Sequence, residues 1–140
     1  MFTFVFLISM KCKRYLPPEQ LQEFLSQFDT LTKIIGFSVQ NRPIKMLEIG
    51  SGPYKILIWS QMHGNESTTT KALLDLIPWF IDVNQEMLHS SFKLYIIPQL
   101  NPDGSLVYTR NNANNIDLNR DAIKMSQPES KALKFIYEKI

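Results

Sequence analysis

The 140-residue sequence contains a single cysteine, Cys12, so the chain cannot form an intramolecular disulfide. This excludes a small secreted protein stapled by disulfides and is compatible with a reducing compartment. An excess of one charge is also missing, because 15 Lys and Arg stand against 13 Asp and Glu. The basic residues are scattered, with no stripe of interleaved aromatics, so nucleic acid is not an expected partner.

Long apolar runs are absent as well. Residues 1–10, MFTFVFLISM, fall far short of the roughly 20 apolar residues of a membrane-spanning helix, which predicts no stable membrane insertion. They also make a poor signal peptide, because no basic residues precede them and three follow before residue 15. Residues 1–14 are therefore interpreted as an uncertain N-terminal extension or a poor signal-like segment. A cytoplasmic and an exported protein both remain open.

The composition is that of an ordinary globular protein, with 44% hydrophobic and 20% charged residues. This mix is far from the low hydrophobicity and high charge of disordered chains. The length fits one domain.

Hydrophobic spacing predicts the first elements. An apolar face at Leu21, Phe24, Leu25 and Phe28 follows two prolines and indicates a helix. From residue 36 to residue 50 polar and apolar positions alternate, with a break at 41–43, which predicts a β-hairpin.

Two short apolar runs predict the centre of a sheet. KILIWSQ, residues 55–61, and FKLYIIPQ, residues 92–99, are typical of strands buried on both faces. Between them, residues 66–83 predict a helix that buries Leu73, Leu76, Ile77 and Phe80 and is kinked or ended early by Pro78. Trp59 and Trp79 are expected in the core.

The last elements are a polar turn, a loop and a helix. NPDG, residues 101–104, favours a type I turn, and an Asn-rich loop follows to residue 120. Ser126 and Glu129 form a Ser-x-x-Glu pattern, which predicts a capping box ahead of an amphipathic helix. The order of elements predicts an α/β fold with a mixed sheet and flanking helices, whose ligands gather at the carboxyl ends of the strands.

His63 and Glu66 directly follow the first buried strand, at this ligand-binding edge. An imidazole and a carboxylate three positions apart can converge on one cation, and zinc accepts both ligand types. For an isolated pair, the plainer interpretation is a loop histidine and a carboxylate that complements a helix N-terminus.

The loop TRNNANNIDLNRD contributes Arg110, Asn119 and Arg120. A guanidinium grips a carboxylate through two parallel hydrogen bonds, and a donor aimed at a carbonyl oxygen stabilises a developing oxyanion. The alternative is a solvated loop held by Asn side chains bonded to the backbone. Asp117 is expected to cap or brace this loop, and Glu48 to be a surface residue.

Five motifs occur in the order found in the zinc carboxypeptidases of the carboxypeptidase A type: GFSVQNRPI, QMHGNEST, NPDG, RNNANNIDLNRD and QPESKAL. Together they cover residues 36–135, and the chain resembles that family. The resemblance implies the N-terminal half of a zinc-carboxypeptidase-like (phosphorylase/hydrolase-like) fold. It makes residues 15–140 the N-terminal part of such a domain, truncated at its C-terminus.

The resemblance also implies roles for single residues. His63 and Glu66 look like two ligands of one Zn²⁺, and Arg110 like the arginine that polarises the scissile carbonyl. Asn119 and Arg120 look like the pair that grips the substrate's terminal carboxylate. The implied activity is hydrolysis of the C-terminal bond of a peptide or protein.

The family pattern is incomplete in this chain. A third zinc ligand, a substrate-contacting tyrosine and the general-base glutamate come from later segments in family members. The other histidine, His89, lies ahead of the second buried strand, at the edge opposite His63. Two further interpretations stay open: an aspartoacylase-like zinc amidohydrolase, and a non-catalytic remnant that binds peptide C-termini.

Overall fold

The computed structural model describes residues 15–82 and 84–140, so the N-terminal segment and Cys12 lie outside the described residues. Four strands form one mixed sheet in the order β1-β2-β4-β3. They are β1 (Thr32–Phe37), β2 (Pro43–Ile49), β3 (Tyr54–Trp59) and β4 (Phe92–Ile97). β1, β2 and β4 are joined antiparallel, whereas β3 runs parallel to β4.

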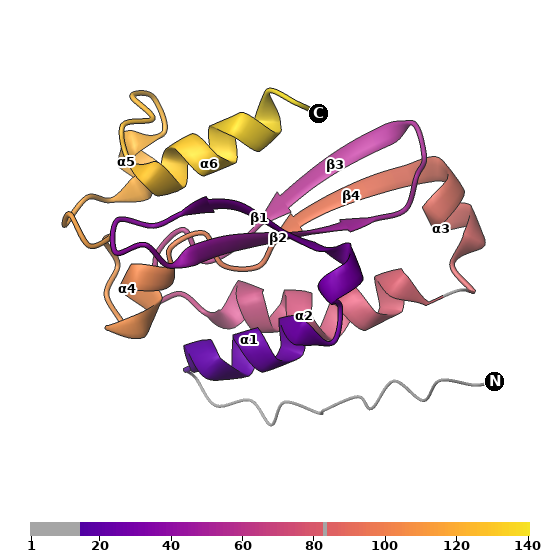
Figure 1. The fold of residues 1–140 in the computed structure, drawn as a ribbon, viewed down its shortest axis with the longest axis horizontal. Helices are drawn as coiled ribbons and strands as arrows, with labels where there is room; N and C mark the ends of the chain where they lie inside the picture. The colour runs from indigo at the N-terminus through magenta and orange to yellow at the C-terminus, as the bar shows by residue number, and fades with distance from the viewer. Residues whose placement is uncertain (1–14, 83) are drawn as a thin grey trace.

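Helices cover both faces of this sheet, which confirms the predicted α/β architecture (Figure 1). α1 (Pro18–Ser26) and α2 (Thr68–Ile81) pack on one face through a cluster that includes Leu25, Ile77 and Ile96. α6 (Pro128–Tyr137) packs on the other face through Leu133 and Ile136. Alternate residues of each strand face the two clusters, as the two-residue period of a strand requires.

The shorter helices lie at the ends of the sheet. They are η1 (Asp29–Leu31), α3 (Glu86–Ser91), α4 (Pro102–Leu106) and α5 (Leu118–Asp121). In Figure 1, α3 lies at one end of the sheet, whereas α4 and α5 lie at the other. No helix among residues 15–82 and 84–140 is long and apolar enough to span a membrane.

The predicted first helix and hairpin are confirmed by α1 and by the antiparallel pair β1 and β2. The second buried strand is also confirmed, because the last four residues of β4 are buried between two neighbouring strands.

The prediction that residues 55–61 form a strand buried on both faces is wrong. β3 is the edge strand of the sheet, and Tyr54, Ile56 and Trp59 are exposed by 66%, 39% and 43%. An apolar run indicates a strand that can be buried, but the position of the strand in the sheet decides how much of each side chain is exposed.

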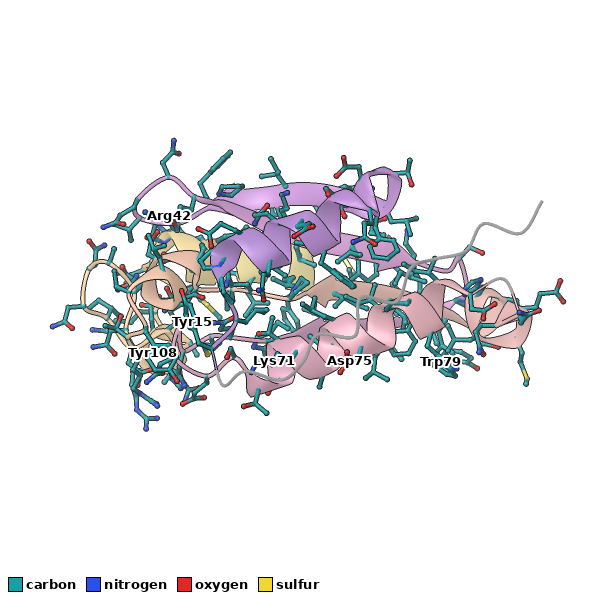
Figure 2. All side chains as sticks on the ribbon, turned by 90° about the horizontal axis from the view of Figure 1, so that it is seen from below. Tyr15, Arg42, Lys71, Asp75, Trp79 and Tyr108 are labelled. Carbon is teal, nitrogen blue, oxygen red and sulfur yellow. The ribbon has the colours of Figure 1, made fainter. Side chains whose placement is uncertain are left out.

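α2 also departs from the prediction. It begins at Thr68 and continues past Pro78 to Ile81, and Leu76 is exposed where burial was expected. Trp79 is half exposed, so the expectation of two core tryptophans is wrong. Figure 2 shows Trp79 in a row with Lys71 and Asp75 along α2.

The predicted capping box of the last helix is wrong too. Gln127 is the N-cap residue of α6, and its side chain accepts no capping hydrogen bond. The Ser126 hydroxyl donates to Asp121 Oδ1 instead, at 2.6 Å. The fully buried Glu129 accepts hydrogen bonds from Val39 N and Asn112 Nδ2. Partners outside α6 therefore take both side chains away from the helix terminus.

Candidate metal and substrate site

The carboxyl ends of β3 and β4 meet at one edge of the sheet, because these two strands are parallel. Their pairing continues past the strands, where Leu100 N donates to Ser60 O and Asn101 N donates to Gln61 O. The two loops that carry the predicted site residues therefore leave the sheet side by side.

The NPDG segment begins the helix α4 and does more than make a turn. Asn101 caps this helix by accepting from Gly104 N at 2.9 Å. Its amide nitrogen lies 3.3 Å from Met62 O and 3.4 Å from Arg110 O, and the whole residue is buried. One asparagine thus joins the loop after β3 to the loop that carries Arg110.

Gly64 lets the same two loops approach each other. A Cβ at Gly64 would lie 2.0 Å from the carbonyl carbon of Gly104, which no real side chain tolerates. Gly64 N also donates to Arg110 O at 3.3 Å. A residue with a side chain here would force the HGNE loop away from α4.

A buried polar network supports the loop from below. Gln61 has φ of 50°, and its amide nitrogen donates to Gly64 O at 2.7 Å and to Ser105 Oγ at 2.9 Å. Thr70 Oγ1 and Gln99 Nε2 donate to Gln61 Oε1. Because these groups satisfy one another in a dry environment, they hold the backbone ahead of His63 in one conformation.

Four charged or titratable side chains meet above this support. His63 Nδ1 lies 3.1 Å from Glu66 Oε2, and His63 Nε2 lies 3.0 Å from Asp117 Oδ1. Arg110 closes the ring, with Nη1 3.2 Å from Glu66 Oε1 and Nε 3.1 Å from Asp117 Oδ2. His63, Glu66 and Arg110, three of the predicted site residues, are therefore linked in one ring of contacts that Asp117 completes.

Asp117 was expected only to brace its own loop, but it also contacts His63 and Arg110. It is the N-cap of α5 and accepts from Asn119 N at 2.9 Å, which confirms the expected bracing of the loop. Burial alone raises the pKa of Asp117. Hydrogen bonds from His63, Arg110 and Asn119 outweigh that effect and lower the pKa to about 2. Asp117 is therefore a carboxylate at neutral pH.

The predicted carboxylate-gripping pair lies on α5, directly after Asp117. The side chains of Asn119 and Arg120 are exposed to solvent. Within the part of the chain that the structure describes, the Arg120 guanidinium has no hydrogen bond or ion pair. Arg120 is thus available to an external anion, whereas Arg110 is engaged by two carboxylates.

Asp103 is a second carboxylate whose importance only the structure reveals. It is buried, and it binds the hairpin turn through Ser38 Oγ at 2.8 Å, Gln40 N at 2.9 Å and Arg42 Nη1 at 2.6 Å. These contacts fix α4 against the turn between β1 and β2. In the sequence, Asp103 stands out only as part of the NPDG turn. Its role could not be predicted, because its partners lie more than 60 residues away.

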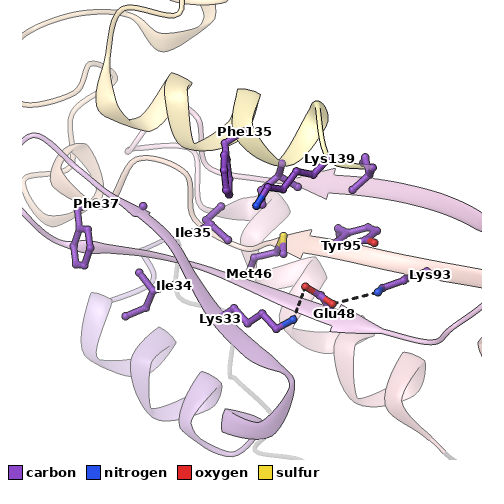
Figure 3. A pocket seen from close by; sticks show the side chains of 13 residues that line it. Lys33, Ile34, Ile35, Phe37, Met46, Glu48, Lys93, Tyr95, Phe135 and Lys139 are labelled. Carbon is purple, nitrogen blue, oxygen red and sulfur yellow. Dashed lines mark hydrogen bonds and ion pairs between the residues drawn. The ribbon is translucent and has the colours of Figure 1, made fainter.

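Glu48 lies outside this cluster, in a groove of about 620 Å³ between the sheet and α6 (Figure 3). It forms ion pairs with Lys33 and Lys93, and these lower its pKa despite partial burial.

The donor atoms of His63 and Glu66 fit one zinc ion. Two tetrahedral ligands at about 2.0–2.2 Å from zinc lie about 3.4 Å apart, close to the observed 3.1 Å. When Nε2 donates to Asp117, Nδ1 turns its lone pair toward Glu66, an arrangement that favours a cation between them. In residues 15–82 and 84–140, no third His, Cys, Asp or Glu joins them to form a metal-binding group.

Comparison with known proteins identifies the family of the chain. A family profile described as zinc carboxypeptidase matches residues 18–132, which is most of the chain. The chain belongs to the zinc carboxypeptidase family. Carboxypeptidase SOL1 of Arabidopsis thaliana is 32% identical over 136 residues, covering 81% of this chain and 28% of that protein. Carboxypeptidase D of Mus musculus is 30% identical, covering 72% of this chain and 9% of that protein.

Solved structures of zinc carboxypeptidases share the fold. A metallo-carboxypeptidase from Burkholderia cenocepacia has a TM-score of 0.79 at 25% identity, covering 91% of this chain and 39% of that chain. A Pseudomonas aeruginosa metallo-carboxypeptidase in complex with (2-guanidinoethylmercapto)succinic acid has a TM-score of 0.74 at 23% identity. This match covers 90% of the present chain and 38% of the Pseudomonas aeruginosa chain. The chain therefore spans well under half the length of these relatives.

Proposed function

We propose that this chain forms part of the active site of a zinc carboxypeptidase, which hydrolyses the C-terminal peptide bond of peptides or proteins. The observation that carries the proposal is the contact of His63 Nδ1 with Glu66 Oε2, with Asp117 joining His63 to Arg110. His63 and Glu66 are the proposed zinc ligands.

Zinc bound there would polarise the peptide carbonyl and lower the pKa of a bound water. Asp117 prepares the imidazole for that ion, because its contact with Nε2 fixes the tautomer and the ring orientation. An imidazole held in this way needs no reorganisation to bind the metal through Nδ1.

Arg110 is the proposed donor to the scissile carbonyl oxygen. Its Nε is bonded to Asp117, which limits the guanidinium to a small arc beside Glu66. The hollow next to it, about 360 Å³, is lined by polar groups that include Thr109 and Asn111. A fixed cation beside the metal ligands stabilises negative charge as it develops on a carbonyl oxygen.

Asn119 and Arg120 are the proposed recognition pair for the terminal carboxylate. The planar guanidinium offers two parallel donors, which match the two oxygens of a carboxylate. Because the Arg120 side chain is exposed and its loop is braced by Asp117, it can meet a substrate without breaking an internal ion pair.

A catalytic zinc site has three protein ligands and an open position. The described residues supply two ligands, so we propose that a third ligand and a general base come from outside the described residues. This count also favours a second candidate function, a chain that binds peptide C-termini weakly and does not hydrolyse them.

Binding measurements test the proposal on the chain as it is. In the presence of zinc, a peptide with a free C-terminus should bind more tightly than the same peptide amidated, and His63→Ala should abolish the contribution of zinc. His89→Ala is the control. His89 lies on α3, at the end of the sheet opposite α4 and α5, and its ring nitrogen contacts Phe80 O (Figure 1). Preferential binding of an N-acylated amino acid would favour the amidohydrolase. Equal binding of both peptides would refute recognition of a carboxylate.

A further inference from the structure

Glu129 is the most deeply buried carboxylate among the described residues, with 0% of its surface exposed. No Lys, Arg or His of residues 15–82 and 84–140 forms an ion pair with it. Burying a carboxylate without a cation is costly, so the hydrogen bonds that it accepts have to compensate. The partners in these bonds indicate what the carboxylate does.

Each oxygen of Glu129 accepts from a different segment of the chain. Oε1 accepts from Val39 N at 3.2 Å, in the turn between β1 and β2. Oε2 accepts from Asn112 Nδ2 at 3.1 Å, in the loop between α4 and α5. A glutamine would turn its NH₂ group toward one of these two donors. The position therefore requires a group that accepts on both sides.

Asn112 closes a compact turn in the loop that it joins to Glu129. Its backbone N donates to Ile116 O at 3.0 Å, and its side-chain Oδ1 accepts from Ile116 N at 3.0 Å and from Asn114 N at 3.1 Å. Both ends of the segment 112–116 are thus held together by one residue.

The other half of the Asn112 amide points to α6. Nδ2 lies 3.0 Å from Gln127 Oε1 and 3.1 Å from Glu129 Oε2. With two bonds accepted and two donated, the hydrogen-bonding capacity of this amide is fully used. Asn112 is 5% exposed and Glu129 is not exposed at all, and any further chain would only bury them more.

The closed turn lies between two residues of the candidate site. Arg110 precedes Asn112 by two positions, and Asp117 directly follows Ile116. Because residues 112 and 116 are bonded to each other, the segments on either side stay close, and Arg110 Nε meets Asp117 Oδ2 at 3.1 Å. An open turn would let these two side chains separate.

We propose that Glu129 and Asn112 are positioning residues for Arg110. The Glu129 carboxylate fixes the Asn112 amide, and the amide closes the turn that holds Arg110 against Asp117. The inference rests on the proposed role of Arg110 at the scissile carbonyl. It adds two buried residues from outside the ring of contacts around His63.

The test exchanges the acid and the amide. Asn112→Asp sets two carboxylates against each other, and Glu129→Gln sets an NH₂ group against an N–H donor. Each single variant therefore breaks the bond. In the double variant the new glutamine donates to the new aspartate, and its oxygen still accepts from Val39 N. Gln127 turns its amide to donate as well, so the network forms again with its direction reversed.

The readout is the Nε–H signal of Arg110 in proton–nitrogen correlation spectra of the full chain, at mildly acidic pH and without zinc or peptide. Arg110→Lys identifies the signal by removing it. The bond to Asp117 slows exchange of this proton with water. We expect each single variant to speed the exchange by about tenfold or more, and the double variant to restore most of the parent rate.

Ile77→Val is the control for a general loss of stability. Ile77 is fully buried in the cluster that α1 and α2 form with the sheet, so the lost methyl group destabilises the fold without touching the loop. The Arg110 signal should keep its parent exchange rate in this variant.

Unchanged exchange in both single variants would show that Glu129 and Asn112 serve the fold alone. If a single variant does not fold, the double variant decides: recovery of the signal supports the proposal, and a double variant that exchanges or melts like the single ones overturns it. Neither zinc nor peptide enters the measurement. Failure of the peptide-binding test would therefore refute the proposed function without altering these rates.

Discussion

Replacing Asp117 by asparagine tests whether one carboxylate organises the candidate site. The amide still accepts a hydrogen bond from Asn119 N, so the cap of α5 is retained. It carries no charge, and its NH₂ group cannot accept from Arg110 Nε. The substitution thus removes the contact to Arg110 and the negative charge that faces His63, while the oxygen that caps α5 is kept.

The magnitude follows from the pKa of Asp117, which falls from 3.8 to about 2 in the folded chain. Each pKa unit corresponds to about 1.4 kcal/mol, so the charged form contributes about 2 kcal/mol to stability at neutral pH. Because the folded pKa is lowered, this contribution is complete above pH 4 and is lost as the pH falls toward 2. Asp117→Asn should therefore cost about 2 kcal/mol at pH 7 and little near pH 2.

Urea unfolding at several pH values measures this loss, and zinc titration of the same samples measures the effect on the metal site. Asp121→Asn is the matched control. Burial raises the pKa of Asp121, but bonds from Ser126 and the backbone of Gln127 lower it to about 2. Asp121→Asn should show the same pH-dependent loss of stability without weakening zinc binding.

Two results would contradict this reasoning. A loss of stability in Asp117→Asn that is the same at pH 7 and pH 3 would show that the carboxylate charge is not its cause. Equal zinc affinity of the Asp117 and Asp121 variants would show that the charge of Asp117 does not support zinc binding at His63.

Three further predictions concern the neighbouring residues. The parent chain should bind zinc more weakly than a complete three-ligand site, and His63→Ala should remove most of that binding in a calorimetric titration. Gly64→Ala should destabilise the fold by about 2 kcal/mol or more, because the added methyl meets the backbone of Gly104, whereas the exposed Asn65→Ala should have little effect on the melting temperature. In any longer, active form, Arg120→Ala should lower kcat/KM by about tenfold to several hundredfold for peptides with a free C-terminus, and should change the hydrolysis of amidated peptides much less.

The sequence alone was sufficient for features that depend on neighbouring residues. Apolar spacing indicated α1, the hairpin and β4, since each pattern is set within one element. The position of His63 and Glu66 at the ligand-binding edge of the sheet also followed, because they directly follow a strand whose carboxyl end lies there.

Tertiary structure decided what depends on partners distant in the chain. The exposure of β3 follows from the strand order, which no local pattern contains. Glu129 has the sequence of a capping residue, yet Val39 and Asn112 bind it in the core. Asp117 has the sequence of a loop cap, and only folding brings His63, 54 positions away, to the oxygen that caps Asn119. Local chemistry determines which contacts a residue is able to make, and long-range packing determines which of them form, because burial and pairing depend on the whole fold.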